Sequence, residues 1–268
     1  MTMKSFLITL IPLVSLSIAQ EPGAVAEPEP EPKEKKKPQY VLDLESLTPE
    51  ENKAYGQSFF RADRLFKENR IFECLEELEK VHEIYDGNPS SLNLQGACYV
   101  EFRAFEKARN AFAKADAVSP GNINVQFNIA EVDFVSKNYA EALKQFEALL
   151  KRSESEKVAT NMLPILKFKV LLCRLMAKDV DGAAKIIEDH SFLDDTPLFY
   201  YGKAALAYQQ DDGATAEKWL ARAGRIFRDQ KLLAPWQDTL IEFGYIKSFY
   251  GGDLEVENGN IPDVGEGE

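Results

Sequence analysis

Apolar and small residues recur along the middle of the chain at the spacing of amphipathic helices. Leu92, Gly96 and Tyr99 follow one another at intervals of four and three residues, which places them on one face of a helix. A second stripe of apolar and small residues follows directly: Phe105, Ala108, Phe112 and Ala115. Pro120 and Gly121 then favour a helix end. The pattern predicts two helices joined by a short turn.

This second stripe is repeated 34 residues later (105 to 139, 108 to 142). The matching residues are Tyr139, Ala142, Phe146 and Leu149. A fixed period of this length indicates helical hairpins that stack and bury their apolar faces against their neighbours. Mid-helix Gly96 fits this picture, because a missing side chain lets a second helix approach closely.

The spacing and the helix-end signals together predict helices throughout residues 49–250. Thr48 and Glu51 form a capping-box pattern at the first helix, and Pro235 suits the first position of the last one. The last helix would cover the final apolar face with a stripe that includes Trp236 and Leu240. The expected ranges are 49–68, 71–85, 89–103, 105–118, 122–136, 139–152, 158–178, 180–190, 197–210, 213–229 and 235–250.

The unit from Pro89 to Pro120 resembles the tetratricopeptide (TPR) repeat family. It carries that family's series of bulky, small, aromatic, Ala, Phe, Ala and Pro positions, with Leu92 in place of the usual Trp. The following unit departs further, with Asp133 in the aromatic position and Glu154 in the Pro position. The resemblance implies an all-α, right-handed α-solenoid of about five hairpins with a C-terminal capping helix.

Weaker units extend this register in both directions. The positions that match are Ala62, Ile71, Cys74, Leu78 and Val81 upstream, and Ala204, Ala216, Leu220 and Ala223 downstream. Between them Leu171, Ala183 and Ile187 mark a degenerate unit, shifted by an insertion around residues 153–160.

In TPR proteins the first helix of each hairpin lines a concave groove that binds peptides or helices, and this implies a set of partner-binding residues here. The set is Phe59, Asp63, Phe66, Asn93, Phe127, Glu131 and Phe134. A groove with aromatic walls and carboxylates would prefer an apolar segment that carries Lys or Arg. The alternative is that the phenylalanines pack between hairpins. The Lys and Arg that clamp a terminal carboxylate in some TPR proteins are not at matching positions, which leaves only Asn93 and Asn128.

The two ends of the chain have a different composition from its middle. Residues 1–19 combine Lys4, an apolar stretch and a small-residue cleavage site at Ala19, as in a secretory signal peptide, and Ala26 ends a second candidate cleavage site. An uncleaved N-terminal anchor is the alternative. Residues 20–47 form a linker rich in Pro, Glu and Lys, residues 48–250 the solenoid, and residues 251–268 an acidic tail expected to be disordered. The signal predicts export to the periplasm or the cell exterior, with no stable membrane span after cleavage.

The remaining composition excludes several classes of function. The net charge is −12 and no basic stripe stands out, which disfavours nucleic-acid binding. His82 and His190 are the two histidines, and no phosphate-binding loop, nucleophile elbow or metal-site spacing accompanies them. We therefore expect no enzyme activity, cofactor or metal. Cys74, Cys98 and Cys173 fit buried free thiols, with one disulfide and a leftover thiol as the alternative in an exported protein.

These observations predict an exported protein-interaction scaffold that binds a peptide or protein segment of unknown identity in the groove of its hairpins. The alternative is a structural subunit of a cell-envelope or secretion assembly, which would bind through its outer face or its ends.

Overall fold

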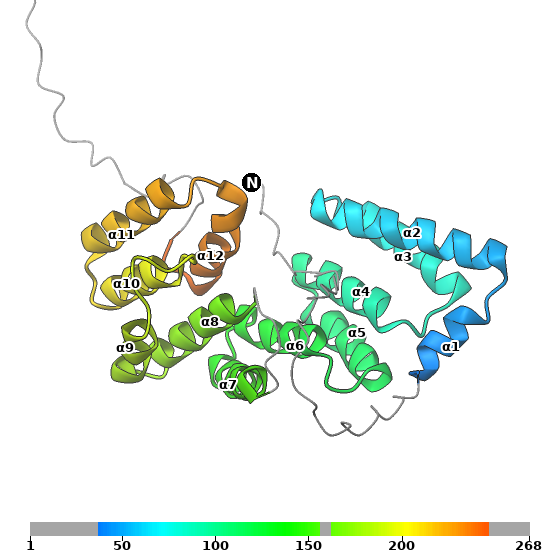
Figure 1. Cartoon of the computed structure of the whole chain (residues 1–268), viewed down its shortest axis with the longest axis horizontal. Coiled ribbons are helices and arrows are strands. Elements are labelled where there is room, and N and C mark those ends of the chain that lie inside the picture. Colours follow the sequence, from blue (N-terminus) through cyan, green and yellow to red (C-terminus); the bar gives the residue numbers. More distant parts are fainter. Residues whose placement is uncertain (1–36, 156–161, 247–268) are drawn as a thin grey trace, which may run out of the picture. The chain divides into compact units, whose positions relative to one another are not determined.

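The computed structural model describes residues 37–155 and 162–246, and every regular element in them is an α-helix (Figure 1). The helices are α1 (Gln39–Glu45), α2 (Pro49–Lys67), α3 (Ile71–Ile84), α4 (Pro89–Glu101), α5 (Phe105–Val118), α6 (Ile123–Val135), α7 (Tyr139–Ser155), α8 (Leu163–Met176), α9 (Val180–Glu188), α10 (Leu198–Gln209), α11 (Gly213–Ile226) and α12 (Gln230–Phe243). The predicted signal peptide, residues 20–36 of the linker and the acidic tail lie outside the described residues.

The helices belong to two compact units, which divide between Ser136 and Lys137. In the first unit α2 pairs with α3 and α4 pairs with α5, while α6 packs on α5 and α4. In the second unit α8 pairs with α9 and α10 pairs with α11, while α7 and α12 pack on α8. Consecutive helix pairs thus form the hairpins that the period predicts.

A repeated turn marks each hairpin. The residue that leads from the first helix to the second has a positive φ at Asn69 (59°), Arg103 (55°), Lys137 (66°), Lys178 (63°) and Asp211 (57°). The first three are 34 residues apart (69, 103, 137), and the step to Lys178 is seven residues longer (178 − 137 = 41). Within the described residues the same turn conformation therefore occurs five times between consecutive helices, and the longer step reflects the inserted segment. None of these residues is the glycine that a left-handed conformation usually selects, so the sequence did not reveal them.

Small residues at the predicted positions are fully buried. The fully buried members are Ala62, Cys74, Ala108, Ala115, Ala142, Ala183, Ala204, Ala216 and Ala223. At Gly96 the two helices approach closely, because a Cβ there would lie 2.4 Å from Cε1 of Phe112. This confirms that α4 and α5 meet where the glycine leaves room.

Two helix starts differ from the sequence prediction. α1 forms within residues assigned to the linker, and it is held in place by the Tyr85 hydroxyl, which donates to Asp43 Oδ2 at 3.0 Å. α12 begins at Gln230 rather than Pro235, because the Asp229 side chain caps it by accepting from the backbone N–H of Lys231. Pro235 therefore lies inside the helix, beyond its first turn, where it has no N–H to donate to the Lys231 carbonyl. At the first hairpin the predicted capping box between Thr48 and Glu51 is present.

α12 covers the first helices of the second unit. Trp236 is buried, and its ring centroid lies 5.3 Å from that of Phe168 on α8 and 5.6 Å from that of Tyr201 on α10. The predicted apolar stripe is confirmed at Trp236, Leu240 and Phe243, which are all buried. The helix therefore bridges two hairpins instead of stacking on the last one alone.

Candidate functional site

The first hairpin keeps part of the predicted groove accessible. Phe59 is half-buried on α2, where its ring stacks on Tyr55 with centroids 6.3 Å apart. Asp63 lies one helical turn later, and its Oδ2 accepts a hydrogen bond from Lys67 Nζ at 2.5 Å. Its other oxygen, Oδ1, is buried and has no hydrogen-bond partner. Phe66 is buried in the core shared by α2, α3 and α4, so it packs rather than facing a groove.

The other predicted site residues are buried. Asn93 on α4 and Asn128 on α6 bond to each other, with Asn128 Nδ2 donating to Asn93 Oδ1 at 2.8 Å. Phe127, Glu131 and Phe134 are 8%, 3% and 1% exposed. Their burial matches the alternative in which these side chains pack, and it leaves Phe59 and Asp63 as the accessible members of the predicted set.

The same slot recurs in every hairpin and is already filled in the second unit. Phe59 and Asn93 each stand 15 residues before the fully buried small residue of the next helix (74 − 59 and 108 − 93). Phe168 and Tyr201 hold that relation to Ala183 and Ala216 (183 − 168 and 216 − 201). We call this position the first-helix slot. In the second unit Trp236 of α12 sits on two such slots, which shows that an amphipathic helix fits this face.

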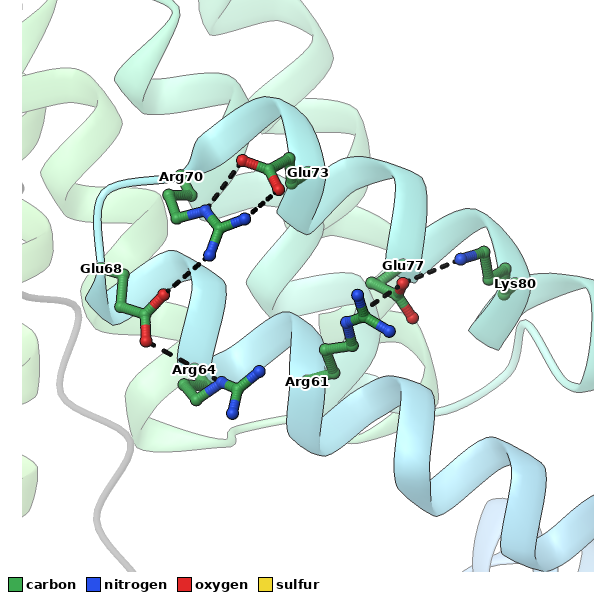
Figure 2. A network of polar contacts seen from close by, with 7 residues as sticks. All are labelled: Arg61, Arg64, Glu68, Arg70, Glu73, Glu77 and Lys80. Carbon is green, nitrogen blue, oxygen red and sulfur yellow. Dashed lines mark hydrogen bonds and ion pairs between the residues drawn. The ribbon is translucent and has the colours of Figure 1, made fainter.

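A network of ion pairs ties α2 to α3 on the first hairpin (Figure 2). Arg61 Nε lies 3.5 Å and Lys80 Nζ 2.8 Å from Glu77 Oε1, and the Glu77 side chain is buried. Arg70 bonds both Glu68 and Glu73. Two acidic residues of α3, Glu73 and Glu77, are therefore paired with arginine or lysine. Most of these groups are exposed, so each pair adds little stability.

A shallow cleft of about 530 Å³ lies between α4 and α5. Most of the residues that line it have polar or charged side chains: Gln95, Tyr99, Glu106, Lys107, Asn110, Ala111 and Lys114. Lys107 Nζ stands 5.7 Å from the centroid of the Tyr99 ring. The amides and the two ammonium groups suit hydrogen-bond acceptors of a polypeptide, and the sequence pattern did not point to this cleft.

The histidines have structural partners. His82 Nε2 lies 3.2 Å from Ser91 Oγ, but Ser91 is fully buried and its hydroxyl donates to the Asn88 carbonyl, so it cannot reach a substrate. His190 Nδ1 lies 2.8 Å from Asp194 Oδ2, and this contact lowers the pKa of Asp194. In the described part of the chain no group of three or more His, Cys, Asp or Glu side chains could hold a metal ion.

Among the helices of residues 37–155 and 162–246, none is both long and apolar enough to cross a bilayer.

Comparison with known proteins supports the architecture through structure alone. Neither a protein-family model nor a curated protein matches the chain. A tetratricopeptide repeat protein from Parabacteroides merdae matches 75% of this chain and 75% of its own length, with 16% identity and a TM-score of 0.53. PilF of Pseudomonas aeruginosa matches over 72% of this chain and 93% of its own (16% identity, TM-score 0.51). MamA from Desulfovibrio magneticus matches over 66% of this chain and 97% of its own length, with 15% identity and a TM-score of 0.50.

The chain has the tetratricopeptide-repeat fold. One departure from the TPR pattern now has a physical reason. Asp133, in the position that is usually aromatic, accepts from Arg109 Nη1 of α5 at 2.6 Å, and Arg109 Nη2 donates to Ser136 Oγ at 3.1 Å. An ion pair between Arg109 and Asp133 thus takes the place of an aromatic contact where α6 packs on α5.

Proposed function

We propose that the protein is an exported interaction scaffold that binds an amphipathic segment of a partner protein on the first-helix face of its first hairpin. The segment places an apolar side chain on Phe59 and a Lys, Arg or backbone N–H on Asp63. The proposal is carried by the Asp63 carboxylate beside Phe59: its Oδ1 is buried and has no hydrogen-bond partner within the chain, and the side chain would turn to bring this oxygen to a partner's donor. A buried oxygen without a hydrogen-bond donor destabilises the protein, and a donor from a partner would remove that cost.

The second unit supports a helical form for that segment. There α12 lies across the first-helix slots Phe168 and Tyr201 and buries Trp236 on them. An intramolecular helix is thus an example of what this kind of face accepts. In the first hairpin Phe59 is half-buried at the same slot and packs against the core with part of its ring, and Asp63 adds a carboxylate beside it. We infer that the partner's helix is apolar on one side and carries a cation next to that side.

The test is affinity capture with the tagged protein from an extract of its own compartment, followed by quantitative mass spectrometry. Asp63→Asn keeps the shape of the side chain and removes its charge, so specific partners should be lost by tenfold or more, about 1.4 kcal/mol. Glu76→Gln, on the exposed surface of α3, is the matched control and should capture as the wild type does. Equal capture by both variants, with unchanged helix content, would refute the proposed site.

A second candidate function rests on a different surface. Phe72 at the start of α3 is 73% exposed, Phe102 after α4 is 39% exposed, and their ring centroids are 4.6 Å apart. Two exposed aromatic rings in contact favour docking on the second-helix side, as expected for a fixed subunit of an envelope or secretion assembly. Loss of stable co-purification in Phe72→Ala, with capture retained in Asp63→Asn, would favour this function over the first.

Export is part of the proposal and has its own test. Cell fractionation should place the protein in the periplasm or the medium, and N-terminal sequencing should find a mature chain that starts after Ala19 or Ala26. A chain that keeps Met1 and sediments with membranes would instead support the uncleaved anchor.

A further inference from the structure

Two of the three cysteines meet inside the first unit. Cys74 belongs to α3 and Cys98 to α4, and both are fully buried. Their Sγ atoms are 3.3 Å apart, with the Cys98 thiol donating to Cys74. They share one core cluster with Leu78, Leu94 and Ala97. Cys173 lies on α8, in the second unit.

We propose that Cys74 and Cys98 form a disulfide bond that joins the first hairpin to the second. All three cysteines are thiols in the structure. The two sulfur atoms need to move together by little more than 1 Å to reach the bonding distance of about 2.05 Å. Neighbouring buried cysteines remain thiols in a reducing cytosol, whereas in an oxidising compartment such a pair is oxidised. The inference goes beyond partner binding; it rests on the proposed export and not on Asp63.

The reaction is a thiol–disulfide exchange with a disulfide oxidant, such as glutathione disulfide or the oxidised form of a thiol oxidoreductase. One cysteine thiolate attacks a sulfur of the oxidant, which gives a mixed disulfide and one released thiol. The second cysteine then displaces the second thiol of the oxidant. The cysteines lose two electrons and two protons, and the oxidant gains both.

Burial determines when this exchange can occur. Hydrogen bonding to Cys74 and burial raise the pKa of the Cys98 thiol, so few thiolate ions form in the folded state. With both side chains fully buried, a bulky oxidant also cannot reach them. Oxidation therefore takes place while the chain folds, and the finished bond is then protected from reductants.

The consequence is a redox-dependent stability of the first unit. The bond would close a loop between residues 24 apart in sequence, which restricts the unfolded chain. We expect the melting temperature of the oxidised protein to exceed that of the reduced protein by roughly 6–12 °C. The bond would also fix α3 against α4 and so hold neighbouring hairpins in one arrangement.

The test is to refold the full chain from urea in a buffer of reduced and oxidised glutathione, alkylate it under denaturing conditions and map the peptides by mass spectrometry. We expect one alkylated cysteine per chain, Cys173, and a peptide that links Cys74 to Cys98. Cys173→Ala should leave that link intact. Cys98→Ala should abolish it, together with the difference in melting temperature between protein refolded in glutathione and protein refolded in dithiothreitol. Three alkylated cysteines, or a link that involves Cys173, would overturn the proposal. Circular dichroism of each variant verifies that it has folded.

Discussion

Replacement of Gly96 by alanine gives the sharpest test of how the hairpins pack. The added Cβ would lie 2.4 Å from Cε1 and 2.6 Å from Cδ1 of Phe112. The Phe112 ring is fully buried, so it must move by about 1 Å into a packed interior. Overpacking of this kind costs roughly 1–3 kcal/mol. Alanine returns about 1 kcal/mol of helix propensity, so the net loss should be up to about 2 kcal/mol.

Gly56 is the matched control, because it also lies inside a helix of the first unit and a Cβ there would meet nothing within 4 Å. Gly56→Ala should therefore stabilise the protein by up to about 1 kcal/mol. Urea unfolding followed by circular dichroism measures both variants. The two substitutions are chemically identical, so an opposite sign isolates the effect of packing from that of propensity.

A double-mutant cycle separates the contact from other effects. In a Phe112→Leu background the ring is gone, so Gly96→Ala should cost at least about 1 kcal/mol less than in the wild type. The reasoning is refuted if Gly96→Ala stabilises the protein as much as Gly56→Ala does. It is also refuted if the cost is the same with and without the Phe112 ring.

Three further outcomes follow from the same contacts. Trp236→Ala should destabilise the second unit by about 3–5 kcal/mol, measured by urea unfolding, because it removes a buried ring that spans two first-helix slots. Thr48→Ala should cost about 1 kcal/mol through loss of the capping box, with Thr48→Ser as a control close to wild type. Burial lowers the pKa of His82, with Lys114 adding to the effect and Asp86 opposing it. At acidic pH the unfolded chain therefore binds more protons at this side chain than the folded chain does. Melting temperature should therefore fall as pH drops below about 6.5, and His82→Gln should flatten that part of the profile.

Much of the fold could be predicted from the sequence because the positions that determine it are simple. Small residues such as Ala108 and Ala142 recur at one period, and they are buried at the helix contacts as the period requires. The start of α12 could not be predicted in this way, since Asp229 and Pro235 are both good helix-start residues and only the capping bond decides between them. The left-handed turns could not be predicted either, because Arg103 and Lys137 have a positive φ that is unusual for residues of their types.

The candidate site was harder to predict for a physical reason. Register places Phe59, Phe66 and Phe127 on first helices, but it does not say whether another part of the chain covers them. Phe66 and Phe127 are buried, whereas Phe59 stays accessible. Whether a slot is filled depends on contacts between distant segments, such as that of Trp236 with Phe168. Those contacts have no signature in the local pattern.

The most direct test of the proposed scaffold is photo-crosslinking in cells from position 59. A benzophenone side chain at Phe59 should crosslink to a partner protein, because this slot lies on the proposed binding face. The same side chain at Phe60, which is 70% exposed and points about 100° away around α2, should give little or no such product. Asp63→Asn should weaken the crosslink from position 59. Equal crosslinking from both positions, or from position 60 alone, would contradict the account.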